Sequence, residues 1–175
     1  MFNENEWFKS FFQLENKDFD LSKIESAKNF VLFWSLFERY FCDKEASLRV
    51  IDDNFTKLSD LYSMPSEITE HYYELFRNRY TSNGVVNSLI ESLNFRRKYS
   101  DPNYKSKLIE ILENDSASEK DKVFACFIII YRYRNNLFHG SKKIANIETQ
   151  LEIFENSNNV IAIFLDFLKS SSKLK

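Results

Sequence analysis

Histidine chemistry in this 175-residue chain is confined to two positions, His71 and His139. His139 follows Arg134 by five residues and Asn135 by four, at the end of the most apolar segment. A spacing of four places Asn135 and His139 on one face of a helix, one turn apart. Arg134 lies about 140° away on an ideal helix, but a last turn that tightens or unwinds brings arginine and histidine together. His71 is expected to be a partly buried neighbour of Tyr72.

An arginine–histidine pair suits phosphodiester chemistry. The imidazole can accept or donate a proton near neutral pH. A guanidinium offers a planar fork of donors for the extra negative charge that a phosphate carries in its transition state. Neither step needs a metal ion, and the sequence contains no carboxylate–histidine cluster that would hold one. We therefore expect neither a metal site nor another cofactor.

Two stretches of the chain resemble the HEPN superfamily of small helical-bundle proteins. Residues 134–140 (RNNLFHG) resemble its Arg-x4–6-His signature, in the form typical of Apea-like and abortive-infection members. Residues 31–40 (VLFWSLFERY) are similar to an early helix of that bundle. The resemblance implies a metal-independent endoribonuclease, in which the ribose 2′-OH attacks the adjacent phosphate and leaves 2′,3′-cyclic phosphate and 5′-OH ends.

The resemblance also implies residue roles and partners. Arg134 would stabilise the phosphorane, His139 would be the general base or acid, and Asn135 would orient the imidazole or bind phosphate. The substrate would be RNA, and the Arg and His residues of both subunits of a homodimer would line one cleft. A toxin or anti-phage defence setting is implied, with an inhibitory antitoxin or a defence-system partner protein. In one branch of the superfamily, an adenylyltransferase partner silences the toxin by modifying a tyrosine two positions after the histidine. Ser141 occupies that position here, so we do not expect this form of control.

Other functions are compatible with the same residues. His139 could be a C-terminal capping histidine that meets the helix dipole, with Arg134 paired to a surface acid. The chain could also bind RNA or a protein without cutting, as a non-catalytic helical adaptor, or be a nucleotide-binding regulatory module. Loss of RNA cleavage on substitution of His139 would distinguish the enzyme from these alternatives.

Four further charged residues are candidates for supporting roles. Glu38 falls in a helical row of apolar residues, where a carboxylate is costly unless it is paired. It either holds Arg134 or Arg132 in place, or lies solvated at the edge of the apolar face. Arg132, Lys142 and Lys143 lie beside the motif and are the expected RNA-binding residues, because cations there would contact phosphates.

The composition predicts a single domain over residues 1–175. Apolar residues make up 43% of the chain, enough for a core, whereas 2 Gly and 2 Pro leave few turns for a many-stranded sandwich or barrel. The net charge of −2 provides no overall positive field for nucleic acid, so RNA must contact a local basic patch. The sequence has no signal-peptide pattern and no membrane-spanning run, and Cys42 and Cys126 are isolated, so we expect a cytoplasmic protein.

The expected fold class is all-α, a HEPN-like helical bundle with a four-helix core and additional short helices. Capping signals and helical periodicity predict helices at 22–41, 46–62, 65–80, about 86–93, 101–114, 116–139 and about 147–168. The helix at 22–41 has the widest apolar face and is expected at the centre of the bundle. Ser116 and Glu119 are expected to form a capping box, and residues 156–159 to weaken the last helix.

Overall fold

Helices make up most of the protein. The structure, a computed structural model, describes residues 2–11, 25–59, 63–96, 101–138 and 150–171. In chain order, its elements are α1 (Glu4–Phe11), α2 (Glu25–Phe41), α3 (Leu48–Ser59), the π-helix η2 (Ile68–Tyr72), α4 (Tyr73–Tyr80), β1 (Thr81–Ser82), β2 (Val85–Val86), the 3-10 helix η3 (Ser88–Leu93), α5 (Asp101–Glu113), α6 (Glu119–Phe138) and α7 (Leu151–Ser170). The expected all-α class is confirmed, with one small hairpin as the β-structure of the described ranges.

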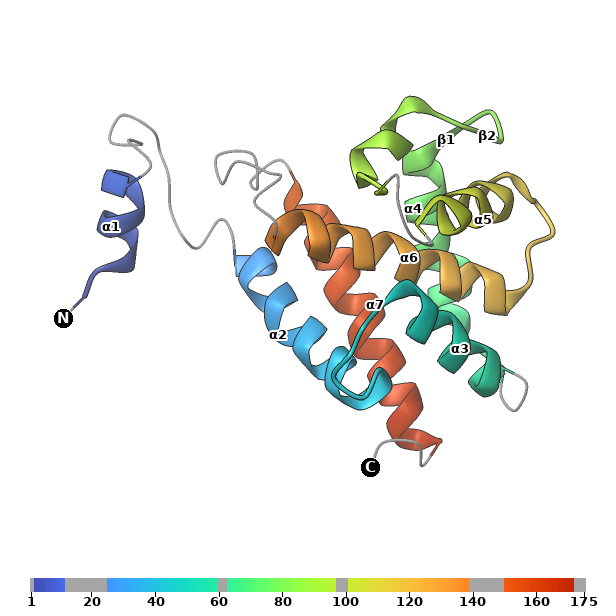
Figure 1. The fold of residues 1–175 in the computed structure, drawn as a ribbon, viewed down its shortest axis with the longest axis horizontal. Helices are drawn as coiled ribbons and strands as arrows, with labels where there is room; N and C mark the ends of the chain where they lie inside the picture. The colour runs from blue at the N-terminus through green and yellow to red at the C-terminus, as the bar shows by residue number, and fades with distance from the viewer. Residues whose placement is uncertain (1, 12–24, 60–62, 97–100, 139–149, 172–175) are drawn as a thin grey trace.

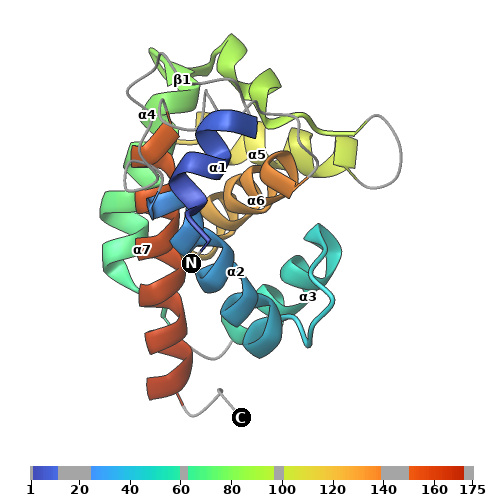
Figure 2. The same ribbon diagram turned by 90° about the vertical axis from the view of Figure 1, so that its left-hand side faces the viewer.

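The central helix of the fold is α6. Its residues 123–130 are all buried, so every side of this stretch faces other parts of the protein. Figure 1 shows α6 crossing α7, with one end near the start of α2, and in the view of Figure 2 α2 appears between α7 and α3. The expectation that residues 22–41 form the central helix is wrong, because α2 keeps an exposed outer face that includes Leu32 and Leu36.

The helices α2 and α7 pack side by side and run in the same direction. Phe30 meets Phe154 at 5.3 Å between ring centroids, and further along both helices Phe41 meets Phe164 at 5.0 Å. Phe127 of α6 also packs on Phe164, at 4.9 Å. Burying one phenylalanine contributes about 1.5–3 kcal/mol. This aromatic cluster therefore fixes α6 against the α2–α7 pair.

The polar run at residues 156–159 does not interrupt α7. Ser157 and Asn158 are buried, and Ser157 Oγ donates a hydrogen bond to the carbonyl of Ile153 at 2.7 Å. Asn158 Nδ2 donates to the carbonyl of Ser26 at 2.9 Å, which ties α7 to the first turn of α2. The expected weak point is wrong, since the helix continues through this run with Ser157 Oγ and Asn158 Nδ2 hydrogen-bonded, although the buried Oδ1 of Asn158 has no partner among the described residues.

A two-stranded hairpin follows α4. Its strands pair antiparallel around Asn83 and Gly84, whose φ angles are 53° and 77°. Positive φ at both central residues defines the type I′ turn that Asn-Gly favours. The turn is therefore the one that an Asn-Gly pair favours. Val86 lies in a strand, so the short helix expected from about residue 86 begins at Ser88, as a 3-10 helix.

The capping box of α6 lies two residues later than expected. Ser118 Oγ accepts a hydrogen bond from the backbone N–H of Asp121 at 3.2 Å and donates to its Oδ2 at 2.6 Å. Ser116 instead donates its backbone N–H to Oδ1 of Asn114 at 2.9 Å, in the preceding loop. Glu119 is the first residue of the helix and not its third.

Cys42 and Cys126 are both buried free thiols. None of the described helices has the length and the apolar character needed to cross a membrane. The expected helix starts at Ser22 and about 147, the expected helix end near 139 and residues 60–62 lie outside the described ranges.

Candidate active site

Arg134 lies one turn before the end of α6 and points at α2. Its Cζ lies 5.8 Å from the centroid of the Trp34 ring, within the range of a cation–π contact. Nη2 lies 3.9 Å from Oε2 of Glu38, and Nη1 donates a hydrogen bond to Oδ1 of Asn135 at 3.1 Å. The side chain is 28% exposed. The side chain is thus held in place and keeps part of its surface exposed, although Nε of its guanidinium is buried.

Glu38 connects this arginine to the loop after α2. Its Oε1 accepts a hydrogen bond from the backbone N–H of Ala46 at 3.2 Å, while Oε2 faces Arg134. The side chain is 23% exposed, and both carboxylate oxygens have a neighbour that stabilises the charge. Of the two arginines expected as its partner, the structure places Arg134 beside Glu38.

Trp34 belongs to the site, although the sequence pattern places it only in the apolar row of α2. Its buried ring lies under the guanidinium and packs on Tyr131, with centroids 6.0 Å apart. Its Nε1–H is buried with no acceptor among the described residues, and an unsatisfied buried donor costs about 1–3 kcal/mol. The sequence signal that could have identified Trp34 as a site residue is its spacing, because it lies four residues before Glu38 on the same face of the helix.

Arg132 is a structural residue in this fold. Its side chain is 3% exposed, and Nε donates a hydrogen bond to the carbonyl of Leu93 at 2.9 Å, while Nη2 donates to the carbonyl of Asn94. Its Cζ also lies 5.1 Å from the centroid of the Phe95 ring. The expectation that Arg132 binds RNA is corrected here, because its donors point inward at the end of η3 and not at solvent.

Asn136 makes a second connection between α6 and the end of η3. Its Nδ2 donates a hydrogen bond to the carbonyl of Ser92 at 3.1 Å, and its Oδ1 accepts one from Nδ2 of Asn94 at 3.3 Å. Asn94 has a left-handed backbone, with φ 52°, which asparagine tolerates better than most residues. Together with Arg132, this amide anchors the helical turn that precedes His139.

The tyrosines of the motif segment belong to the core. Tyr133 is buried, and its hydroxyl is hydrogen-bonded to the hydroxyl of Tyr80. Burial is the main cause that raises the pKa of both phenols, so both stay protonated at neutral pH. Tyr131 is half-buried against Trp34. Both tyrosines therefore contribute to the packing of α6.

Three predicted site residues, His139, Lys142 and Lys143, lie outside the described residues. The structure therefore brings together Arg134 and Asn135 of the predicted catalytic set with the supporting residue Glu38.

His71 is exposed on η2, with its ring centroid 4.8 Å from that of Tyr72. The aromatic contact is as expected, whereas the expected partial burial is wrong. The π-helix turns this side chain outward while Tyr72 is buried.

The described ranges contain neither a cluster of metal ligands nor a reactive thiol. Within the described ranges, no group of three or more His, Cys, Asp or Glu residues could hold a metal ion. Burial raises the pKa of the Cys42 thiol to about 12, and burial also raises that of Cys126. Both thiols are therefore protonated at neutral pH and are poor nucleophiles.

Comparison of the chain with known protein families, with curated proteins and with solved structures finds no match.

Proposed function

We propose that this protein is a HEPN-type, metal-independent endoribonuclease that acts as a toxin or an anti-phage defence effector. The observation that carries the proposal is the state of Arg134. Its guanidinium is oriented by Trp34, Glu38 and Asn135, and its side chain remains partly exposed. Arg134 also belongs to the helix that precedes His139 in the sequence. An oriented, accessible guanidinium is what stabilisation of a phosphorane requires.

In the proposed reaction, His139 takes the proton of the ribose 2′-OH as its oxygen attacks the adjacent phosphorus. Arg134 donates hydrogen bonds to the non-bridging oxygens, where negative charge develops. The P–O5′ bond then breaks, and the His139 imidazolium of a second subunit protonates the leaving 5′ oxygen. The products are a 2′,3′-cyclic phosphate and a 5′-OH. Asn135 already accepts from Arg134, so its proposed role is to orient that guanidinium.

The test is cleavage of labelled RNA by the purified protein in EDTA. We expect His139→Ala to lower the rate by at least about 10² and Arg134→Ala by about 10²–10³. Arg49→Ala is the matched control, because Arg49 is an exposed arginine whose ion pair within the described ranges is with Asp53, at 3.8 Å. Products must end in 2′,3′-cyclic phosphate. Full activity in the His139→Ala protein would refute the site assignment.

A non-catalytic helical adaptor is the second candidate. The observation that favours it is that the contacts of Arg134 with Glu38 and Trp34 would also hold α6 to α2 in an inactive protein. Intact RNA under every condition, together with a lower midpoint of thermal unfolding in the Arg134→Ala protein, would support the adaptor over the enzyme. Measurement of mass in solution tests the proposed homodimer separately.

A further inference from the structure

The outer face of α2 carries apolar side chains that no described element covers. Leu32 is 66% exposed and Leu36 is 44% exposed, with α1 in the position that the structure gives it. The two leucines are four residues apart, so they lie on one side of the helix. The other side carries Phe30, Trp34 and Phe37 and is buried. Exposed apolar residues that adjoin one another in this way mark a surface for binding another protein.

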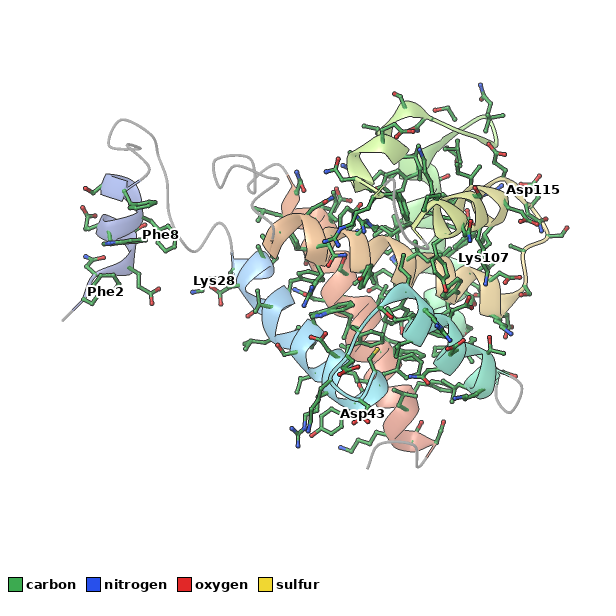
Figure 3. All side chains as sticks on the ribbon, in the orientation of Figure 1. Phe2, Phe8, Lys28, Asp43, Lys107 and Asp115 are labelled. Carbon is green, nitrogen blue, oxygen red and sulfur yellow. The ribbon has the colours of Figure 1, made fainter. Side chains whose placement is uncertain are left out.

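Charged side chains border the two leucines. Of the four charged residues of α2, three lie within about 40° of Leu32 around the helix axis, namely Glu25, Lys28 and Arg39. The fourth, Glu38, lies about 120° from Leu32 and belongs to the candidate site. Figure 3 shows Lys28 projecting away from the bundle near the start of α2. The outer face is thus an apolar centre with charges at both ends.

The spacing of these charges makes the face complementary to a second copy of itself. Glu25 precedes Leu32 by seven residues and Arg39 follows it by seven, which is about 10.5 Å in each direction. In an antiparallel pair of α2 helices with Leu32 on the two-fold axis, each Glu25 would face the partner's Arg39. A parallel pair would place like charges together at every position. The charges therefore favour the antiparallel pair.

Lys28 fits the same arrangement. It lies one turn from the axis on one side and Leu36 lies one turn from it on the other, so the Lys28 stem would pack on the partner's Leu36. The Lys28 ammonium is 3.3 Å from Oε2 of Glu25 in its own subunit, so it would remain beside a carboxylate. An axis at Leu36 would instead bring Lys28 towards the partner's Lys44. The axis at Leu32 is thus the one that avoids contact between like charges.

We propose that two copies of this chain form a dimer through the outer face of α2, which consists of Glu25, Lys28, Leu32, Leu36 and Arg39. The two α2 helices lie antiparallel, and Leu32 is on the two-fold axis. The occupant of the face is a second copy because opposite charges at equal distances from the centre make a surface self-complementary under a two-fold rotation.

This surface also relates the two candidate sites to each other. A two-fold axis perpendicular to both α2 helices leaves the two Glu38 side chains, and with them the two Arg134 side chains, on the same side of the helix pair. A cleft that both subunits line requires such an arrangement. This consequence rests on the proposed ribonuclease function, whereas the contact between the two α2 helices does not.

The first test is the mass of the protein in solution, measured by analytical ultracentrifugation over a range of concentrations. We expect a dimer for the unsubstituted protein. Glu25→Arg and Arg39→Glu should each weaken the dimer by about tenfold or more, because the two-fold axis repeats every contact between like charges. The combined variant reverses both charges and should restore the dimer.

Restoration by the combined variant has a clear meaning. An arginine in the first turn of α2 and a glutamate in its last turn both oppose the helix dipole, so a more stable monomer cannot explain a restored dimer. Arg49→Glu is the control, because Arg49 is exposed on α3, outside the proposed surface. A monomer at every concentration of the unsubstituted protein would overturn the proposal, and so would a combined variant that is folded by circular dichroism but stays monomeric.

A cross-link tests the position of the axis without changing any charge. Leu32 faces itself across the axis, so the Leu32→Cys protein should form a covalent dimer on oxidation. Leu89→Cys is the control, because Leu89 is 47% exposed and lies on η3. The native thiols are buried and do not interfere. Absence of the Leu32→Cys cross-link, or equal cross-linking of the two variants, overturns the proposal.

RNA cleavage, measured on the same samples, separates this proposal from the proposed function. A dimer that responds to the charge reversals and leaves RNA intact supports the surface and refutes the ribonuclease. RNA cleavage by a protein that is monomeric at every concentration overturns the surface and leaves the ribonuclease in place.

Discussion

The substitution Arg132→Met tests whether the end of α6 is anchored to η3 as the structure indicates. Methionine keeps most of the side-chain volume and removes the donors to the carbonyls of Leu93 and Asn94. A hydrogen bond from a charged donor contributes about 1.5–3 kcal/mol, and the contact with Phe95 contributes about 0.5–1 kcal/mol. Because these interactions share one group, we expect a total loss of about 3–4 kcal/mol and not their full sum.

The assay is urea unfolding followed by circular dichroism, with the thermal midpoint as a second measurement. For a chain of this size, 3 kcal/mol corresponds to a fall of about 6–12 °C. Arg49→Met is the control, since Arg49 forms an exposed pair with Asp53 and should change stability by less than about 1 kcal/mol. If Arg132→Met is as mild as the control and instead weakens RNA binding and its salt dependence, the structural assignment of Arg132 is refuted.

Three further outcomes are expected. Glu38→Gln keeps an oxygen that accepts from the backbone and removes the charge beside Arg134. We therefore expect RNA cleavage to be about tenfold slower, while the free energy of unfolding changes by less than about 1 kcal/mol. An unchanged cleavage rate would contradict a positioning role for Glu38. Asn158→Ala removes the hydrogen bond to Ser26 and should cost about 1–2 kcal/mol in urea unfolding, and no loss would mean that this bond does not hold α7 to α2. Burial is the main cause that raises the pKa of Tyr73 to about 12, from 10.0; its neutral form stabilises the fold fully below pH 10, and this stability is lost as the pH rises towards 12. Between pH 10 and 12, the free energy of unfolding should therefore fall less steeply with pH in the Tyr73→Phe protein than in the unsubstituted protein. Equal slopes in the two proteins would contradict a raised pKa for Tyr73.

Local sequence signals were sufficient for most helices and for the hairpin turn, whereas the helix α1 at Glu4–Phe11 was not predicted. Periodicity predicted α2, α4, α5, α6 and α7 with small errors at their ends, because the apolar residues of each helix recur every three or four positions. Asn83-Gly84 predicted its turn because few other residue pairs accept positive φ at both positions. The cap at Ser118 could not be chosen over Ser116 from the sequence, since both begin the same capping pattern.

The candidate site was partly visible in the sequence. The spacing of Arg134 and Asn135 from His139 predicted a shared site, and Glu38 was recognisable as a carboxylate in an apolar row. The choice between Arg132 and Arg134 as its partner could not be made in that way. These arginines are two residues apart on α6, so they point in different directions, and only the packing of α2 and η3 around α6 decides which one meets Glu38.

The amino-acid sequence by itself determined the helical class, the positions of most helices and the residues with the capacity for phosphodiester chemistry, because these depend on neighbours within a few turns. The tertiary structure alone decided that α6 and not α2 is central, that Arg132 is buried, and that Trp34 lies under Arg134. These features depend on contacts between segments that are far apart in the chain. Such contacts favour one arrangement of the helices only when the whole core is assembled.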